Sequence, residues 1–599
     1  MHIHRRHHPS HRLSLRFSLL ALALASPISA SIGQVMEIRP VTPAATGPSA
    51  GSLRGLQAEF ENFRREHLPS MSFGRGASGA CDERVGRFCY WYDEREAKAP
   101  TEPVEIREAR DRFITHLDST AREFPNDRWT MGQLVRYLTE AGRNAEAVNA
   151  AGRCKIDGWW CSALRGFALH AAGRYAAADS AWSRALAAME DRQRCEWRDL
   201  KLLLDDDLLR DYRNANCARR EQFETRVWWL SRPMMSSPGN DARTEYLSRE
   251  LYTNFLEDAP SVHTLGFDVD ERELLLRYGW PRAWSTQTVY VPGRGSQKVI
   301  TGHEPTPAGP MLPMSTSVKN PAFSDSLGWR GKGLPGVRAR YSPDYARRLL
   351  PLMHQSAIFR RGDSALVVLA YDASADTELS SAAAKGEAIS AALVLTKGEE
   401  RDATIVKLPR PALSGTMIAR TSWGPMLMSA EVAAASRSTL ARARYGMKAS
   451  DTPGSRVSIS DLLLFEPYDG MPNTLEEATA HARTSLTVRP NSRVGIYWET
   501  YNTNPSGEGI QVAITVAPEQ TDGSWMRRGL TALRLAREAQ PVTVGITDVS
   551  ARGIAYTPRA VVVDLATLKA GRYLMQLEIT ADGTLPVHAE RVLTVRGGR

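Results

Sequence analysis

Two adjoining stretches decide the fold of the first part of the chain: RWTMGQLVRYLTEAGRNAEAVNAAGRC, residues 128–154, and WWCSALRGFALHAAGRYAAADSAWSRALAAM, residues 159–189. They align at a constant offset of 31 residues, which places the turn at Gly142 over the turn at Gly173. Each stretch has helix-forming segments on both sides of its glycine turn. The repeated pattern predicts two consecutive helical hairpins.

The second stretch resembles a tetratricopeptide repeat. Its first helix carries small residues at Ala163 and Ala168, Gly173 stands at the turn, and Ala178 and Trp182 are four residues apart on the second helix. Small side chains let two helices approach, and a tryptophan fills the groove between them. That family repeats every 34 residues, so the spacing here is a departure, and an irregular helical bundle is the alternative. The resemblance implies a concave face that binds extended partners.

Residues 1–30, MHIHRRHHPSHRLSLRFSLLALALASPISA, have the layout of a secretory signal peptide. Basic residues precede a short apolar run, and small residues surround the expected cleavage point. The run is shorter than the roughly 20 apolar residues that span a bilayer. We therefore expect a periplasmic, secreted or cell-surface protein with no transmembrane segment in the mature chain. A retained N-terminal anchor is the alternative.

The charge of the chain is mildly basic. The formal net charge is +9, and loss of residues 1–30 leaves +5, because they carry four arginines and no acidic residue. Basic pairs such as Arg347-Arg348 and Arg527-Arg528 are scattered among acidic residues. A nucleic-acid-binding protein would concentrate its basic residues on one face, so we expect no nucleic-acid partner.

The six cysteines all precede residue 220 and fall into three neighbouring pairs. An even number in an exported chain indicates disulfides. Their spacing does not match the two-to-four-residue separation of zinc sites. Six cysteines allow fifteen connectivities, and pairing between neighbours is our prediction. The predicted pairs are Cys81 with Cys89, Cys154 with Cys161, and Cys195 with Cys217.

The whole chain is predicted to be a multidomain α + β protein, with a helical-repeat segment followed by a mixed domain and two β-sandwiches. Short apolar or alternating runs bounded by turn residues predict the strands, and seven such runs after residue 484 predict an immunoglobulin-like sandwich. In the run beginning at Val494, alternation predicts that Trp498 faces the core. The predicted divisions are a signal peptide (1–30), a flexible lead-in (31–75) with a short helix at 56–67, a helical tetratricopeptide-like domain (76–225), a mixed domain (226–345), a β-sandwich (346–480) and a C-terminal immunoglobulin-like sandwich (481–599).

A second resemblance covers roughly residues 225–480. The segments that carry it are Trp228-Trp229-Leu230, Asn240-Asp241-Ala242-Arg243-Thr244-Glu245, Arg277-Tyr278-Gly279-Trp280-Pro281, and His354-Gln355 ahead of Phe359-Arg360-Arg361-Gly362-Asp363. In this order they resemble the GWxTD-domain group of exported bacterial proteins. The segment after Gly279-Trp280 lacks the Thr-Asp that names the group. The group has no established activity, so the resemblance implies architecture and compartment only. His354 itself is predicted to lie on a helix.

Few residues form a pattern that is typical of a catalytic, cofactor or metal site. The zincin, nucleophile-elbow, P-loop and dinucleotide motifs are absent from the sequence, and we expect no cofactor. His303 and Glu304 in a Gly/Pro-rich loop are the weak candidates for acid–base catalysis. Asp268 and Asp270 could supply oxygen ligands to Ca²⁺, although acidic residues at this position also cap a helix predicted at 271–278. We favour the cap over the metal site.

The sequence therefore favours an exported, non-enzymatic interaction or scaffold protein of the bacterial cell envelope, with an envelope or secreted protein as partner. The alternative is an envelope enzyme or glycan-binding protein that acts on peptidoglycan or polysaccharide at a site in the middle domain. Convergence of His303, Glu304, Asp268 and Asp270 in one pocket would favour the enzyme. The tryptophans of this region are expected to pack domain junctions, with glycan binding as the alternative; they are Trp228, Trp229, Trp280, Trp284 and Trp329.

Overall fold

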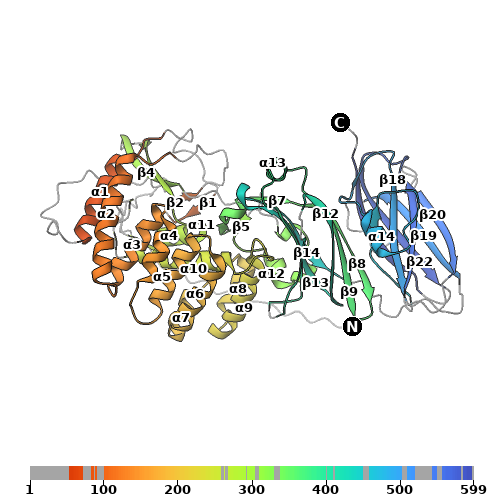
Figure 1. Ribbon diagram of the computed structural model, residues 1–599, viewed down its shortest axis with the longest axis horizontal. Helices are drawn as coiled ribbons and strands as arrows, with labels where there is room; N and C mark the ends of the chain where they lie inside the picture. The colour runs from red at the N-terminus through yellow and green to blue at the C-terminus, as the bar shows by residue number, and fades with distance from the viewer. Residues whose placement is uncertain are drawn as a thin grey trace, which may run out of the picture.

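The computed structural model describes residues 53–71, 83–86, 88–90, 100–257, 259, 262, 267–291, 293, 295–303, 309–329, 338–399, 401–408, 412–448, 457–501, 509–519, 542–549, 556–581 and 585–596. These residues form an elongated molecule with mixed α and β structure. The helices gather at one end, one group of sheets lies in the middle and a second group lies at the other end (Figure 1). The predicted signal peptide and its cleavage site lie outside the described residues.

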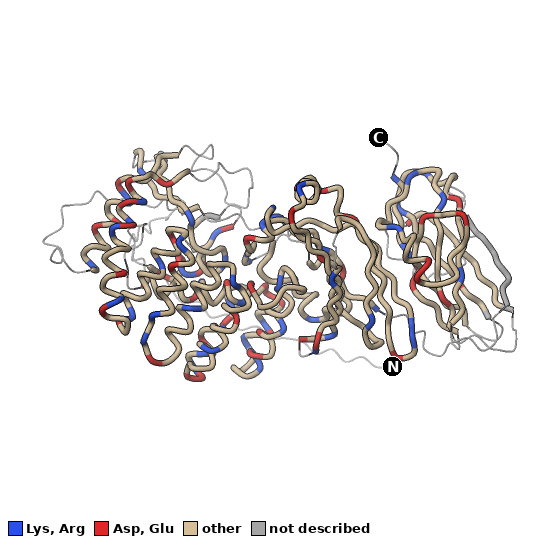
Figure 2. The backbone as a smooth tube through the Cα atoms, in the orientation of Figure 1, with Lys and Arg blue, Asp and Glu red and all other residues tan. Residues whose placement is uncertain are grey.

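A body of helices makes up the first end of the molecule. Within it, α2 to α6 form successive antiparallel pairs (Figure 1). Acidic and basic residues are interspersed along the backbone of this body (Figure 2). Its helices are α1 (Leu53–His67), α2 (Val104–Glu123), α3 (Arg128–Glu140), α4 (Asn144–Gly152), α5 (Trp160–Ala171), α6 (Tyr175–Ala187), α7 (Asp191–Trp197), α8 (Asp206–Arg213), α9 (Cys217–Ser231), α10 (Asp241–Glu257) and α11 (Val269–Tyr278).

The two predicted hairpins are present as α3–α4 and α5–α6, and their turns have the same geometry. The backbone N–H of Arg143 donates to the carbonyl of Leu138 at 2.8 Å, and that of Arg174 donates to Leu169 at 2.9 Å. Gly142 and Gly173 adopt φ values of 71° and 70°. Glycine suits both positions because this left-handed conformation crowds a side chain.

One hydrophobic core runs through residues assigned to four different predicted divisions. It extends from Phe60 on α1 through the hairpins to Trp280 and Tyr341. The boundary expected between 76–225 and 226–345 therefore does not separate two cores. The short helix expected at 56–67 is present as α1, which begins at Leu53 and buries Phe60 against this core.

Short elements connect the helical body to the first group of sheets. A hairpin of β3 (Ala283–Val291) and β4 (Gly295–His303) is followed by β5 (Gly309–Pro310), α12 (Ser315–Lys319) and β6 (Arg340–Tyr341). β5 pairs with β6, and the packing of both onto the helical body buries Met311 and Tyr341.

The first sandwich consists of a five-stranded sheet, in the order β11-β10-β13-β14-β7, and a three-stranded sheet, β12-β9-β8. One apolar core lies between them. His354 lies on β8, which pairs with β9, so the helix predicted there is wrong. The strands are β7 (Arg348–Pro351), β8 (Met353–Arg361), β9 (Ser364–Asp372), β10 (Ser390–Thr396), β11 (Thr404–Lys407), β12 (Ser414–Ser422), β13 (Met426–Ala434) and β14 (Thr439–Met447).

The second sandwich contains all seven strands predicted after residue 484. Two earlier strands join it, because β15 and β16 pair with β18. The boundary expected at 480/481 therefore lies too late in the chain. Trp498 is 2 % exposed and belongs to the core, as predicted. The strands are β15 (Ser458–Ile459), β16 (Leu463–Phe465), β17 (Thr487–Val488), β18 (Arg493–Tyr501), β19 (Gly509–Pro518), β20 (Val542–Val549), β21 (Tyr556–Asp564), β22 (Gly571–Ala581) and β23 (Val587–Val595).

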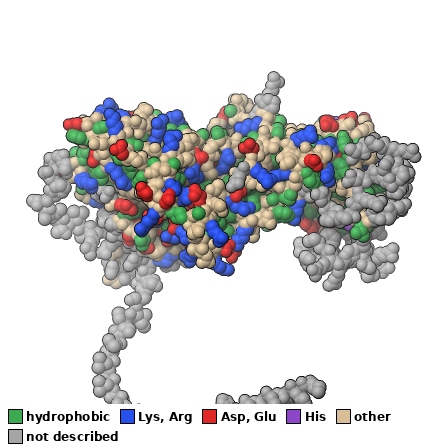
Figure 3. Space-filling view, turned by 90° about the horizontal axis from the view of Figure 1, so that it is seen from below, with side chains coloured by type: hydrophobic (Ala, Val, Ile, Leu, Met, Phe, Trp, Pro, Cys, Tyr) green, Lys and Arg blue, Asp and Glu red, His purple; other side chains and the backbone are tan. Residues whose placement is uncertain are grey.

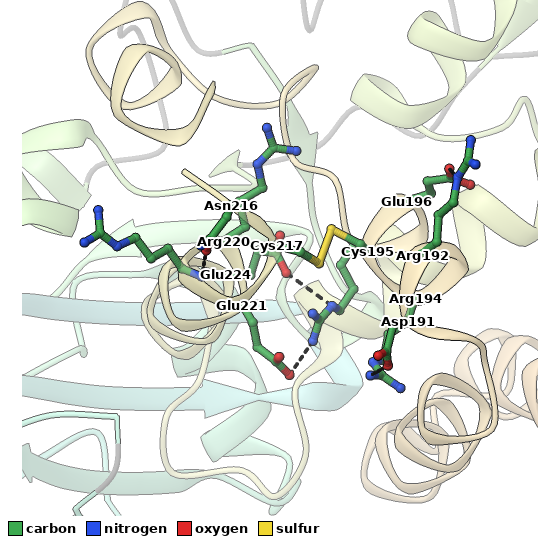
Figure 4. Close-up of a disulfide and its surroundings, with 12 residues drawn as sticks. Asp191, Arg192, Arg194, Cys195, Glu196, Asn216, Cys217, Arg220, Glu221 and Glu224 are labelled. Atoms are coloured by element: carbon green, nitrogen blue, oxygen red, sulfur yellow. Dashed lines mark hydrogen bonds and ion pairs between the residues drawn. A yellow bond between two sulfur atoms is a disulfide. The ribbon is translucent and has the colours of Figure 1, made fainter. Parts of the chain in front are cut away.

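Two of the three predicted disulfides are formed. Cys154 is bonded to Cys161 across the connection between the two hairpins, and Cys195 on α7 is bonded to Cys217 on α9 (Figure 4). The third predicted pair involves Cys81, which lies outside the described residues. Each bond closes a short loop, so both fasten neighbouring helices of the same body.

Within the described part of the chain, no helix has the length and apolar character needed to cross a membrane.

Candidate functional site

Helix α10 occupies the inner face of the helical hairpins. It packs against α3, α5 and α6, and nearly all of its residues are buried. Gln133 on α3 donates from Nε2 to the carbonyl of Phe255 at 2.9 Å, and the ring of Phe167 on α5 packs edge-on against that of Phe255. The face on which a tetratricopeptide repeat would hold an extended partner is therefore covered by the protein's own chain.

A small, solvent-connected cavity opens where α5, α10, α11 and the segment after β6 meet. Its wall carries both charges and aromatic rings. The principal polar groups are His170, Glu245, Arg249 and Arg282, and the aromatic side chains are those of Tyr175, Tyr278, Trp280 and Tyr341. We define this as the His170 cavity. The mixture of fixed charges and rings suits a small polar ligand.

A buried ion network lies at the base of the His170 cavity. His170 Nε2 lies 2.6 Å from Glu245 Oε2, and its Nδ1 lies 2.8 Å from Thr244 Oγ1. Arg249 Nε donates to Glu245 Oε1 at 2.7 Å. Burial opposes ionisation of Glu245, but the charge of Arg249 and the hydrogen bond from His170 outweigh it and lower the pKa of Glu245 to about 2. Glu245 is therefore a fixed negative charge.

Asp241 lies one helical turn before Glu245, and its pKa is shifted in the opposite direction. Burial raises its pKa, and the hydrogen bond that Tyr345 donates to Oδ2 at 2.9 Å only partly opposes this effect. In enzymes, two neighbouring carboxyl groups whose pKa values are shifted in opposite directions can serve as the acid and the base of a reaction. Asp241 and Glu245 on α10 show such opposite shifts. Asp241 is 4 % exposed and lies behind the wall, so the groups that a ligand can reach are those of the cavity.

Two of the four segments that carry the GWxTD resemblance contribute residues to the wall of this cavity. Glu245 comes from one of the segments that carry it, and Gly279 and Trp280 come from another. Sequence reasoning missed His170, which comes from the helical hairpins 75 residues before Glu245. The signal in the sequence was a histidine at the end of an otherwise apolar helix, which by itself does not distinguish a core residue from a site.

Of the predicted pair of His303 and Glu304, the structure describes only His303. His303 ends β4, and its Nε2 lies 2.8 Å from Ser285 Oγ on the partner strand β3. Burial lowers its pKa. Glu304 lies outside the described residues. His303 is not among the residues that line the His170 cavity.

Asp268 is the N-cap of α11, as the favoured interpretation predicted. Its Oδ1 accepts hydrogen bonds from the backbone N–H groups of Asp270 and Glu271, each at 3.1 Å. The helix starts at Val269, two residues earlier than predicted. Among the described side chains, no three or more His, Cys, Asp or Glu residues form a group that could hold a metal ion.

The tryptophans of the middle region mostly pack the interior. Trp228, Trp280 and Trp329 are each 4–5 % exposed and belong to the core of the helical body. Trp280 stacks on Tyr252 at 5.0 Å. Trp229 and Trp284 are partly exposed and pack on the same core. This arrangement supports the packing interpretation rather than a row of sugar-binding rings.

Buried charges fasten the helical body to the first sandwich. Glu431 on β13 accepts hydrogen bonds from the backbone N–H groups of Met235 and Ser236 at 2.8 and 3.0 Å. Arg444 on β14 forms an ion pair with Glu431 at 3.3 Å and donates to the carbonyl of Arg232 at 2.9 Å. Both side chains are almost fully buried, so this junction is a specific contact.

A second buried contact joins the two sandwiches. Arg361 on β8 pairs with Glu499 on β18, and Gln355 exchanges hydrogen bonds with the backbone of Leu464. Apolar residues of both sandwiches share one cluster around Phe359 and Tyr497. The helical body and the two sandwiches are thus connected by specific buried contacts.

Comparison with known proteins assigns no family to the chain. No family model and no curated protein matches it. Among solved structures, the crystal structure of red sea bream transglutaminase is matched with a TM-score of 0.13 and 11 % sequence identity. That match covers 55 % of this chain and 43 % of the transglutaminase chain. A similarity at this level carries no argument about fold or activity.

Proposed function

We propose that the protein is an exported, non-enzymatic scaffold of the bacterial cell envelope, and that it presents binding surfaces to an envelope or secreted protein at fixed distances. The proposal includes the signal peptide, a tetratricopeptide-like ancestry for the α3–α6 hairpins, an immunoglobulin-like second sandwich and membership of the GWxTD group. The observation that carries it is the pair of buried charged junctions, at Glu431–Arg444 and at Arg361–Glu499. In some proteins, buried polar and ionic contacts specify one arrangement of parts, and the proposal assigns that role to these junctions.

The surfaces available to a partner lie outside the helical groove, because α10 fills the inner face of the hairpins. On the face drawn in Figure 3, basic, acidic and apolar groups are interspersed. A partner that contacts the helical body and a sandwich together would depend on the angle between them. Loosening a junction should therefore weaken binding even though each part remains folded.

The experiment compares partner recovery by the processed protein and by Arg361→Ala after crosslinking in envelope extract, with quantification by mass spectrometry. Arg420→Ala serves as the control, because Arg420 is exposed on β12 of the same sandwich. We expect a defined partner with the unmodified protein and the control, and reduced recovery with Arg361→Ala. Recovery of no protein above a mock sample would contradict the scaffold function.

A glycan-binding protein or enzyme of the envelope is the second candidate, and the His170 cavity is the observation that favours it. The cavity combines the fixed charge of Glu245 with several tyrosines, which is a common composition of polar ligand sites. Titration with peptidoglycan fragments, followed by tryptophan fluorescence, tests this candidate. A saturable change that Glu245→Gln abolishes would support it, and an unchanged signal across the glycan panel would remove it.

A further inference from the structure

The junction between the two sandwiches is built along β8. This strand pairs with β9 on one side, and its other edge faces the second sandwich (Figure 1). Asp461, between β15 and β16, accepts from the backbone N–H of Ile358 at 3.0 Å, and its own N–H donates to the carbonyl of Ile358 at 3.2 Å. Arg591 on β23 donates from Nη1 to the carbonyl of Ser356 at 2.8 Å. Groups of the second sandwich therefore satisfy an edge that would otherwise be open to pairing with another chain.

His354 lies near the start of β8, and its hydrogen bonds define the position of its proton. Nδ1 lies 2.9 Å from the carbonyl oxygen of Leu352, which can only accept, so Nδ1 carries the hydrogen. Nε2 lies 2.9 Å from the hydroxyl of Tyr445, and that hydroxyl lies 2.8 Å from Oγ of Ser356. A neutral ring accepts at Nε2, so Tyr445 donates to His354 and accepts from Ser356.

A proton added to His354 would have no anionic partner. Among the described histidines, ion pairs are formed by His170 and His588, and not by His354. Burial lowers the pKa of His354; the bond to the Leu352 carbonyl opposes this effect, and the positive charge of Arg591 adds to it. The ionisable groups around the ring are Tyr371, opposite it on β9, Tyr445 on β14, Arg591 on β23 and Asp461. Asp461 is the acidic group of this set, and it is bonded to the backbone of Ile358 rather than to the ring.

Protonation of His354 would weaken the contact that crosses the junction. An imidazolium donates from Nε2, so Tyr445 would have to turn its hydroxyl hydrogen towards Ser356, whose own hydrogen would lose its acceptor. A second positive charge would also lie close to Arg591. Repulsion between the two cations opposes the hydrogen bond from Arg591 to the carbonyl of Ser356. Both effects act on the edge of β8 that the second sandwich covers.

We propose that the junction between the two sandwiches is an acid-sensitive contact, which loosens when His354 takes up a proton. The ring is partly exposed, so protons reach it from solvent. Because the pKa of His354 is lower in the folded state, the contribution of the neutral ring is complete above its ordinary value of 6.5 and is lost as the pH falls through the lowered value. Loosening would uncover the edge of β8. The inference goes beyond the scaffold function and does not depend on it.

Asp461 acts in the opposite direction. Burial raises its pKa, so its protonation favours the folded state as the pH falls. Asp461→Asn keeps an oxygen that can accept from the N–H of Ile358 and removes this opposing contribution. The acid response of the junction should therefore be at least as large in Asp461→Asn as in the unmodified protein.

The test measures the radius of gyration of the processed full-length protein by small-angle X-ray scattering, at about pH 7.5 and about pH 5. We expect the unmodified protein to expand at the lower pH. His354→Gln retains a donor and an acceptor without titrating, so its radius should not change. His303→Gln is the matched control, because burial also lowers the pKa of this histidine on β4, and it should expand as the unmodified protein does.

NMR of the ring signals in histidine-labelled protein separates a titrating role from a purely structural one. The signal that is missing in His354→Gln identifies His354, and it should titrate below 6.5. In Arg591→Gln it should titrate at a higher pH, because the repelling charge is gone. If that variant does not fold, His354→Gln and Asp461→Asn decide. A constant radius in the unmodified protein, equal expansion in His354→Gln, or titration of His354 at or above 6.5 would each overturn the proposal.

Discussion

The guanidinium of Arg361 in the first sandwich donates from Nη2 to Oε1 of Glu499 in the second, at 2.7 Å, across 138 residues of sequence. The Glu499 side chain is fully buried, and it also accepts hydrogen bonds from the hydroxyls of Tyr497 and Tyr501. Both tyrosines belong to β18 with Glu499, whereas Arg361 reaches the carboxylate from the other sandwich.

Arg361→Ala should destabilise the junction between the sandwiches, because it leaves the Glu499 carboxylate buried without its cation. The expected loss in the free energy of unfolding is about 3 kcal/mol. Urea unfolding measures it, and Arg420→Ala is the control with an expected effect within about 0.5 kcal/mol. A loss as small as that of the control would show that the ion pair does not hold the junction.

The carboxyl group of Glu224 should make stability depend on pH. Burial raises its pKa to about 7, and its Oε1 accepts from the hydroxyl of Tyr212 at 2.6 Å. The folded state then binds a proton more tightly than the unfolded state, whose group has an ordinary pKa near 4.5. The contribution of Glu224 is complete below about pH 4.5 and is lost as the pH rises towards 7.

The free energy of unfolding of the unmodified protein should therefore decline over this range by about 2–3 kcal/mol from Glu224 alone. Glu224→Gln removes the titrating group, so the difference between the two proteins should grow in favour of the variant as the pH rises. Urea unfolding at several values between pH 4.5 and 8 measures the difference. A difference that stays constant with pH would contradict the raised pKa.

The glycine turns of the two hairpins should be equally sensitive to substitution. Gly142→Ala and Gly173→Ala each place a side chain at a positive φ, and the expected cost is about 1–2 kcal/mol each. Neither new methyl group would contact another atom within 4 Å, so the backbone conformation alone is responsible. Thermal unfolding measures both variants.

Gly152→Ala is the matched control for these turns. Gly152 lies in α4, and an added methyl group there also meets nothing within 4 Å, but φ is negative. The substitution should stabilise the protein by about 0.5–1 kcal/mol, because alanine favours helix and restricts the unfolded chain. Equal destabilisation by all three substitutions would reject the assigned turn geometry.

The two described disulfides should differ in their contribution to stability. Cys195 and Cys217 are 22 residues apart, whereas Cys154 and Cys161 are 7 apart. The loop-closure relation gives about 3 kcal/mol for the longer loop and about 2 kcal/mol for the shorter one. Paired Cys→Ser substitutions and urea unfolding under non-reducing conditions test the order, and a larger loss for the shorter loop would contradict it.

Local patterns in the sequence predicted most of the elements. The seven alternating runs after residue 484 are all strands, and Trp498 faces the core as the alternation required. The pairing partners of these strands were harder to predict from the sequence. Residues 457–465 were assigned to the first sandwich because they follow its strands, but β15 and β16 pair with β18. Alternation identifies a strand without specifying which neighbour it pairs with.

Most of the candidate site could not be predicted from the sequence. His303, Asp268 and Asp270 stood out because acidic groups and a His-Glu pair are adjacent in sequence, yet His303 bonds within a hairpin and Asp268 caps a helix. The cavity instead combines His170 and Glu245, which lie on different helices. No local spacing connects them, since their contact depends on how α10 enters the groove of the hairpins.

By itself, the sequence determined the helical hairpins, their glycine turns, the strands and two disulfides, because each depends on residues close together in the chain. The tertiary structure decided that α10 fills the hairpin groove and that Glu431 meets Met235, 196 residues away. It also decided which sheet each strand joins. These arrangements depend on burying apolar faces and pairing buried charges between distant segments. These interactions form only when distant segments meet in the folded chain, so no local sequence pattern predicts them.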